Sequence, residues 1–400
     1  ARPYLNASIF PHLAFKLPGM PAPHFLLELM PPDEVEVWHR KFAVMPDLAV
    51  YRSVIKHTLV ERRWRRFGWN PLTNFRQWTR FEALAGPRLK ALQRNPTSQD
   101  DAIALVTSQL QLTQEYVGIH VCSLLFANIW DQILEGFLAG RLPDQARALH
   151  RGLAVCPPGN KTLACNQALF ELAQYLGREG MEALGSGTSL DSAHQQALDA
   201  FLCTYGNRSQ SSWEVFAPRW KEEPTRLIPY LQSLHGESPP EHTAALQQQR
   251  FEDAKSTLKA SLRAGEWWMA KQLIGLVREY LLLRENQRFF FEQLFGQMKE
   301  TLLWLGEDWV NQGILTTPDD IRFASWLLVQ QTVSGEVSPA ACAEAISQGK
   351  KEWHRAEHKD APDFLRGERP LELDADVRRL QGLGISAGRV EGVVRILSSP

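Results

Sequence analysis

Apolar side chains recur at helical spacing over most of this 400-residue chain, from residue 33 to residue 357. The longest patterns cover 98–138, which opens with the cap-like sequence TSQDD, and 267–312. We predict two helices for the second stretch, with a break near Gly296. The predicted helices are 33–45, 50–68, 75–94, 98–138, 161–184, 190–203, 223–234, 241–264, 267–312, 318–330 and 338–357.

This pattern predicts a mainly α fold, in which a large multi-helix domain carries short irregular or β pieces at both termini. Residues 1–32 are rich in proline and irregular, and residues 358–378 form a polar linker. Residues 389–397 have the alternation of a strand. Since a lone strand has nothing to pair with, we expect residues 379–400 to open a β domain, and the chain to be a fragment. Away from the termini, we expect at most one β element, a short hairpin near 204–220.

The composition of the chain restricts the kinds of molecule that we expect it to bind. The net charge of −1 gives no bias toward nucleic acid or toward an anionic membrane. We expect no apolar run to reach the roughly 18 residues that a membrane helix needs, and we expect no membrane partner. Five scattered cysteines without a CxxC pair are typical of reduced thiols in a cytoplasmic protein.

Most motifs for cofactor chemistry are absent from the sequence. It contains no GxxxxGK[ST] loop, no GxGxxG and no GxSxG, so we expect no cofactor site in this chain. The sequence HRAEH at 354–358 matches the H-x-x-E-H pattern of inverted zinc peptidases, with His354 and His358 one helical turn apart. A polar linker follows directly, which favours a solvated helix end over a zinc site.

The stretch FLCTYGNRSQSSWEVFAPRW, residues 201–220, places charges among large aromatic side chains. Arg208, Glu214 and Arg219 follow a glycine that ends a helical pattern. Charges in such surroundings usually pair with one another. Two interpretations stay open, a salt-bridge cluster that holds a loop in place and a loop that faces an anion or a substrate.

A second charged stretch, VREYLLLRENQRFFFEQLF, covers residues 277–295. Arg284 and Arg288 share a helix face, and Glu285 can pair with Arg288. Apolar residues surround these charges in the sequence, so we expect a buried helix whose charges need partners or a ligand. We expect Arg208 with Glu214, and Arg284 with Glu285 and Arg288, to lie largely buried and close to one another, facing a cavity.

These stretches carry a resemblance to a known family. REYLLLREN-x-R followed by LGEDWVNQGILTTPDDI resembles the central region of phosphoenolpyruvate-synthase-like and rifampicin-phosphotransferase-like enzymes. FLCTYGNRS and APRW are similar to another family landmark. ARPYLNASIF with LPGMP resembles the exit from an ATP-grasp domain, and LQGLGISAGRVEGVVRIL resembles the first strand of a swivelling domain. The chain departs from the pattern at Asn207, where His is usual, at Glu214, where Asp is usual, and at Arg322, where an aromatic is usual.

The resemblance implies an ATP-dependent phosphotransferase that passes a phosphoryl group through a histidine of the swivelling domain to an acceptor. ATP and Mg²⁺ would belong to an ATP-grasp domain outside this chain, and the chain alone would be inactive. Its partners would be those two domains of the same polypeptide and a small-molecule acceptor, either pyruvate or a drug hydroxyl. The long helical segment resembles the rifampicin type. The implied substrate-binding residues, with no catalytic or metal-binding residue among them, are Arg208, Glu214, Arg219, Arg284, Glu285 and Arg288.

A different class of function fits the same residues. The chain could be a non-catalytic helical scaffold or binding domain whose charge clusters are structural. A cavity separates the two interpretations, because a domain that holds an acceptor needs a concave, mostly apolar pocket with a few polar groups. A scaffold would instead be packed throughout.

Overall fold

The computed structural model describes residues 74–357 apart from 156 and 237–239, together with 365–366 and 369–370. It confirms the mainly α prediction. The helices are α6 (Asn74–Ala91), α7 (Gln99–Arg141), α8 (Ala146–Leu153), α9 (Lys161–Ser186), α10 (Ser192–Tyr205), the 3-10 helix η1 (Pro224–Leu227), α11 (Ile228–Leu234), α12 (Pro240–Ser261), α13 (Ala264–Asn311), the 3-10 helix η2 (Pro318–Phe323), α14 (Trp326–Val333) and α15 (Pro339–Glu357). Two-residue strands, β1 (Leu365–Arg366) and β2 (Arg369–Pro370), pair antiparallel.

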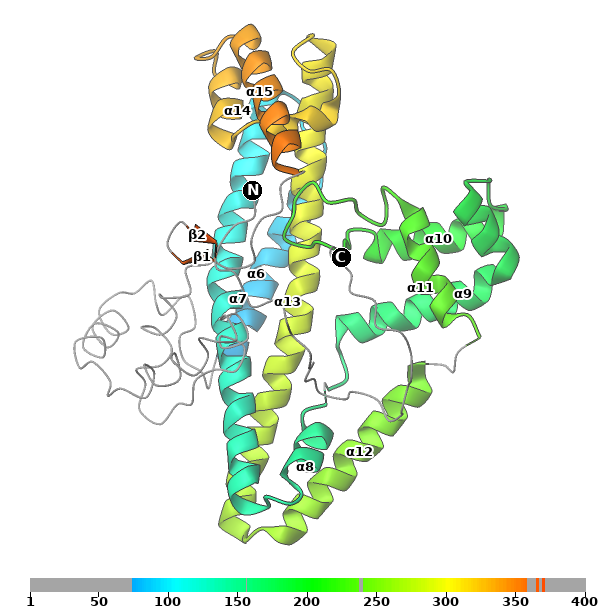
Figure 1. The fold of residues 1–400 in the computed structure, drawn as a ribbon, viewed down its shortest axis with the longest axis vertical. Coiled ribbons are helices and arrows are strands. Elements are labelled where there is room, and N and C mark those ends of the chain that lie inside the picture. The colour runs from blue at the N-terminus through cyan, green and yellow to red at the C-terminus, as the bar shows by residue number, and fades with distance from the viewer. Residues whose placement is uncertain (1–73, 156, 237–239, 358–364, 367–368, 371–400) are drawn as a thin grey trace, which may run out of the picture.

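Two long helices, α7 and α13, run antiparallel along the long axis of the molecule (Figure 1). They contain 43 and 48 residues, which corresponds to about 65 and 72 Å of helix at 1.5 Å per residue. α6 packs beside them, α8 and α12 lie at one end, and α14 and α15 lie at the other (Figure 1). The helices α9, α10 and α11 form a side lobe that contacts α13 through α9.

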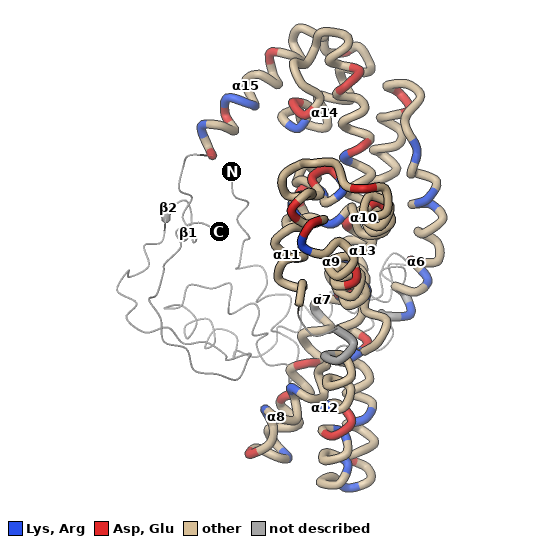
Figure 2. The backbone as a smooth tube through the Cα atoms, turned by 90° about the vertical axis from the view of Figure 1, so that its right-hand side faces the viewer, with Lys and Arg blue, Asp and Glu red and all other residues tan. Residues whose placement is uncertain are grey.

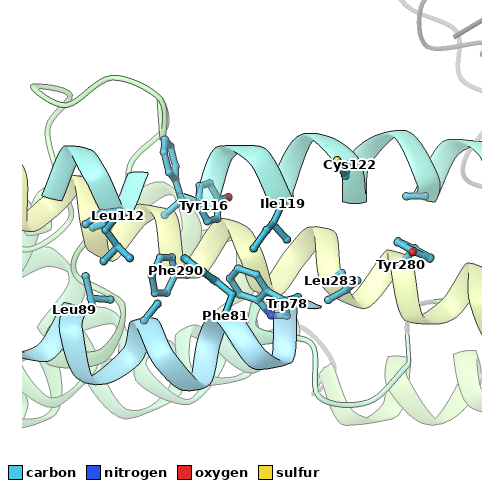
Figure 3. Close-up of a cluster of buried hydrophobic side chains, with 14 of the residues drawn as sticks. Trp78, Phe81, Leu89, Leu112, Tyr116, Ile119, Cys122, Tyr280, Leu283 and Phe290 are labelled. Atoms are coloured by element: carbon cyan, nitrogen blue, oxygen red, sulfur yellow. The ribbon is translucent and has the colours of Figure 1, made fainter. Parts of the chain in front are cut away.

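An aromatic layer joins α6, α7 and α13 at mid-length (Figure 3). The Tyr116 ring of α7 stacks on Phe291 of α13 with ring centroids 5.2 Å apart, and on Phe290 at 5.8 Å. Trp78 and Phe81 of α6 meet Phe290 edge-on. All five rings are buried, and each such pair contributes about 0.5–1.5 kcal/mol beyond its buried area. The three helices are therefore fixed relative to one another at this layer.

Among the described residues, α7 is the one helix long and apolar enough to cross a membrane by length and composition. The expectation that no apolar run reaches that length is wrong by this criterion. In the fold, α7 has protein on several sides, because it contacts α6, α8, α13 and α14. A helix that is apolar around most of its circumference is typical of the centre of a large helical domain as well as of a membrane span.

α13 is one continuous helix, so the predicted break near Gly296 is wrong. An ideal Cβ at Gly296 would lie 2.2 Å from Oδ1 of Asn207. This glycine therefore allows the loop after α10 to approach the helix backbone, and does not end the helix.

The segment between α10 and η1 contains no strand, so the short hairpin near 204–220 does not form. Its two ends are nevertheless bonded to each other. The amide of Trp220 donates to the carbonyl of Arg208, and the amide of Lys221 donates to the carbonyl of Gly206, both at 3.0 Å. The result is a closed, irregular loop lying against α13. We call residues 206–223 the α10–η1 loop.

Several predictions lie outside the described residues. These are the irregular segment 1–32, the helices 33–45 and 50–68, and the strand and β domain at 379–400. The linker 358–378 is described only at β1 and β2.

Replacing Gly296 with alanine should destabilise the fold by about 1–3 kcal/mol, because the new methyl group overlaps Asn207. The matched control is Gly275→Ala on the same helix, where a Cβ meets nothing within 4 Å. That change should stabilise the protein by up to about 1 kcal/mol through helix propensity. Urea unfolding curves of both variants test this. Equal effects of the two substitutions would show that the contact with Asn207 is not what requires glycine.

Candidate functional site

The carboxylate of Glu292, on α13, joins the two charged stretches of the sequence. Its side chain is 2% exposed. Oε1 accepts hydrogen bonds from Ser212 Oγ at 2.7 Å and from Arg288 Nε at 3.1 Å, and Oε2 lies 3.4 Å from Arg208 Nε. Arg208 and Ser212 come from the α10–η1 loop, whereas Arg288 lies one turn before Glu292. The two stretches thus meet at one buried carboxylate. Figure 2 shows both acidic and basic positions in the region labelled α9, α10, α11 and α13.

Arg208 stays charged in this setting. Burial lowers the pKa of its guanidinium, but the negative charge of Glu292 and a hydrogen bond with Cys165 outweigh that effect, so the pKa is raised. Burial in turn raises the pKa of Cys165 and keeps it a thiol. The guanidinium also lies 5.6 Å from the ring centroid of Trp220.

Arg219 has a structural position. It is fully buried, and its guanidinium donates to the carbonyls of Asn207 at 3.2 Å, Glu214 at 2.9 Å and Val215 at 3.3 Å. Burial lowers its pKa, although the negative charge of Glu222 acts in the opposite direction. These bonds fix the path of the α10–η1 loop from inside.

A second buried cation, which the sequence interpretation missed, holds the loop from outside. Lys299 of α13 pairs with Glu222 at 2.6 Å and also donates to the carbonyls of Phe216 and Ala217 at 3.3 Å. Lys299 is one of several charged residues along α13, so the sequence does not single it out. Its partner is 77 positions away, which no local pattern identifies.

Three of the predicted burials are wrong. The side chains of Arg284 and Arg288 are 53% and 48% exposed, because their helix face points away from α7. Arg284 pairs with the adjacent Glu285 at 3.3 Å, and Glu285 also accepts a hydrogen bond from Thr162. Glu214 is exposed and accepts from the amide of Phe216 in its own turn, so it is not the partner of Arg208.

A separate pocket of about 260 Å³ lies between α12 and α13. Phe251 and Ile274 form a buried apolar surface, and Trp267 is half-buried. The Arg278 guanidinium lies over the Phe251 ring at 3.7 Å from its centroid, and Lys255 lies 5.4 Å from the same ring. The full lining is Pro157, Phe251, Lys255, Trp267, Lys271, Ile274, Gly275, Arg278 and Glu279. We call it the α12–α13 pocket.

This pocket is suited to an apolar molecule that carries a negatively charged or hydroxyl group at one end. Apolar lining with few polar groups is the usual composition of a small-molecule site. Three lining residues are cations, namely Lys255, Lys271 and Arg278, against one carboxylate, Glu279. None of the pocket residues belongs to the predicted site set, because they are spread over three elements and carry no motif.

Metal binding finds no support within the described part of the chain. No group of three or more His, Cys, Asp or Glu side chains there could hold a metal ion. Of the HRAEH motif, His354 is exposed and faces Glu357 at 3.4 Å, whereas His358 lies outside the described residues.

Comparison with known proteins identifies relatives of one kind. The family model for the rifampicin phosphotransferase fourth domain matches residues 120–285. The chain is 23% identical over 218 residues to the rifampicin phosphotransferase of Bacillus subtilis (strain 168), covering 51% of this chain and 25% of that protein. It is 23% identical over 276 residues to the rifampicin phosphotransferase of Streptomyces sviceus, covering 61% of this chain and 31% of that protein.

The chain therefore spans about a quarter to a third of the length of these curated relatives. The resemblance predicted from the sequence motifs is confirmed for the rifampicin-phosphotransferase-like family. The matched segment 120–285 contains every residue that lines the α12–α13 pocket.

Glu292→Gln should destabilise the protein by about 3–5 kcal/mol, because it leaves the buried guanidinium of Arg208 without its counter-charge. Arg284→Ala, which removes an exposed pair on the same helix, should change the stability by no more than about 1 kcal/mol. Denaturant unfolding followed by tryptophan fluorescence measures both. A Glu292→Gln variant as stable as Arg284→Ala would mean that the buried carboxylate does not hold the two stretches together.

Proposed function

We propose, because the chain is related to the rifampicin phosphotransferases, that it is the helical, acceptor-holding part of an ATP-dependent phosphotransferase. One observation carries the proposal. The α12–α13 pocket is concave and mostly apolar, and its whole lining falls within the segment that matches the family's fourth domain. The acceptor would occupy this pocket.

The chemistry of phosphoryl transfer explains what such a pocket would contribute. The protein has little covalent chemistry to perform, and rate acceleration comes from positioning the acceptor and from stabilising the charge of the transferred group. Phe251, Trp267 and Ile274 would hold the apolar body of the acceptor. Lys271 and Arg278 are placed to attract the phosphoryl charge.

The described residues do not fit ATP or Mg²⁺. The sequence has no nucleotide loop, and the described part of the chain has no cluster of side chains that could hold a metal ion. The proposal therefore assigns nucleotide chemistry to an ATP-grasp domain and phosphoryl delivery to a swivelling domain, both in the same polypeptide. The share of the relatives' length covered by this chain, about a quarter to a third, supports that assignment.

The size of the pocket limits the part of the acceptor that it holds. At about 260 Å³ it lies just below the range of about 300–1,000 Å³ that is usual for small-molecule sites. It accommodates one apolar segment of a large molecule such as a rifamycin macrocycle, or the whole of a smaller aromatic alcohol. We therefore propose an apolar, hydroxyl-bearing acceptor.

The alternative function is a non-catalytic helical scaffold. The paired charges around Glu292 and Arg219 support it, because they hold a loop in place. They lie apart from the α12–α13 pocket, however, and do not fill it. A pocket with no affinity for an apolar alcohol would favour the scaffold.

Titration of the chain with rifampicin and with 2-naphthol, followed by calorimetry, tests the proposal. Gly275→Trp should weaken binding of either probe by about tenfold or more, which corresponds to about 1.4 kcal/mol, because an indole at this exposed lining position fills the pocket. Gly265→Trp is the matched control, since Gly265 lies on the same helix with open space around it and outside the pocket. The proposal fails if neither probe binds, or if both variants bind alike.

A further inference from the structure

A second cleft, of about 330 Å³, lies where the segment between α6 and α7, the end of α10 and the last third of α13 come together. On α13 its lining residues begin at Gln297, which is about 33 Å along the helix from Gly275 of the α12–α13 pocket, at 1.5 Å per residue. The two sites are therefore separate. We call this second site the Gln297 cleft.

Gln297 is the central feature of this cleft. The residue is 3% exposed and lines the cleft, yet neither its amide oxygen nor its amide nitrogen has a hydrogen-bond partner among the described residues. Asn207 lines the same cleft, and its buried Oδ1 also has no partner there. Two unmatched amide side chains thus border one space.

A further buried amide, that of Gln109, lies next to the lining residue Thr301. Thr301 lines the cleft and receives a hydrogen bond at 3.3 Å from Nε2 of Gln109, which is fully buried on α7. Oε1 of Gln109 has no partner in the described part of the chain. Buried amide groups in proteins are nearly always bonded, so a group of unmatched ones at a single cleft calls for a specific explanation.

The unmatched atoms define the chemistry of a ligand. Among the lining residues, Oδ1 of Asn207 and Oε1 of Gln297 are acceptors, and the amide nitrogen of Gln297 is a donor. Hydroxyl groups fit this mixture, because each both donates and accepts. A charged ligand is disfavoured, because the charges at the rim neutralise each other. Lys221 pairs with Glu300 at 2.5 Å, and Arg94 pairs with Asp101 at 2.6 Å.

We propose that the Gln297 cleft binds a neutral, polyhydroxylated small molecule of about the size of a monosaccharide. Its hydroxyl groups bond to Gln297 and Asn207, with Thr301 beside them. The cleft volume falls within the range of small-molecule sites. This binding site is additional to the proposed acceptor pocket and does not depend on it.

The experiment titrates the 400-residue chain with D-glucose and myo-inositol as neutral polyols, and follows binding by saturation-transfer difference NMR. Inorganic phosphate, acetate and methylammonium serve as charged probes. We expect at least one polyol to bind and the charged probes not to compete with it. Gln297→Met should weaken polyol binding by about tenfold or more, the effect of losing about one hydrogen-bonded group.

Two further variants make the test specific. Gln272→Met is the matched control, because Gln272 is an exposed glutamine of the same helix outside the cleft. It should bind as the unaltered chain does. Cys203→Trp places an indole at an exposed lining position and should block binding without changing buried polar groups, so it decides the matter even if Gln297→Met fails to fold.

Three outcomes would overturn the proposal. The first is that neither polyol binds to the unaltered chain. The second is that a charged probe binds in the cleft in preference to the polyols. The third is that Cys203→Trp, or a folded Gln297→Met, retains full affinity.

Discussion

The stacked contact of Tyr116 with Phe290 and Phe291 fixes α7 against α13, and the rest of the molecule is arranged around that pair. α13 supplies one wall of the α12–α13 pocket near its beginning and one wall of the Gln297 cleft in its last third. Because a continuous helix sets both positions, the spacing of the two sites follows from the helical rise alone. A break in this helix would uncouple the sites from each other and from the aromatic layer.

Along α13, the buried groups that would cost the most free energy if left unpaired are the ones that have partners. Glu292 and Lys299 are charged, and each has an ion-pair partner together with further hydrogen bonds. Gln297 lies between them and is neutral. Within the described part of the chain both of its amide atoms lack a hydrogen-bond partner, whereas Oε2 of Glu292, which also lacks one, still lies 3.4 Å from the Arg208 cation. An unpaired buried charge costs several kcal/mol, whereas an unmatched amide costs about 1–3 kcal/mol. The two buried charges therefore have partners of opposite charge. The neutral amide of Gln297, which has no hydrogen-bond partner among the described residues, borders a cleft.

Periodicity was sufficient to predict most of the described helices, because α7 and α13 bury apolar residues at a helical period, but it did not predict the short helix α8. Periodicity did not predict which side chains contact one another across the helices. Gly296 in a helical pattern indicates either a break or a close contact, and the residue that decides, Asn207, is far away in the sequence. Arg284 has apolar neighbours in the sequence, yet its own face of α13 points outward. The pair of Arg288 and Glu292 follows from helical spacing, whereas the approach of Arg208 requires the fold. The α12–α13 pocket had no sequence signal at all, since its lining comes from separate elements.

The two interpretations of the α10–η1 loop, structural cluster and ligand-facing loop, apply to different residues of the same segment. Arg208 and Arg219 turn inward, where they pair with Glu292 and with the loop's own carbonyls, so they act as supports. Asn207 and Lys221, at the two bonded ends of the loop, line the Gln297 cleft. The amide of Asn207 cannot exchange a proton near neutral pH, but it offers both a donor and an acceptor. This pair of a donor and an acceptor agrees with the proposed neutral, hydroxyl-bearing ligand in the cleft beside it.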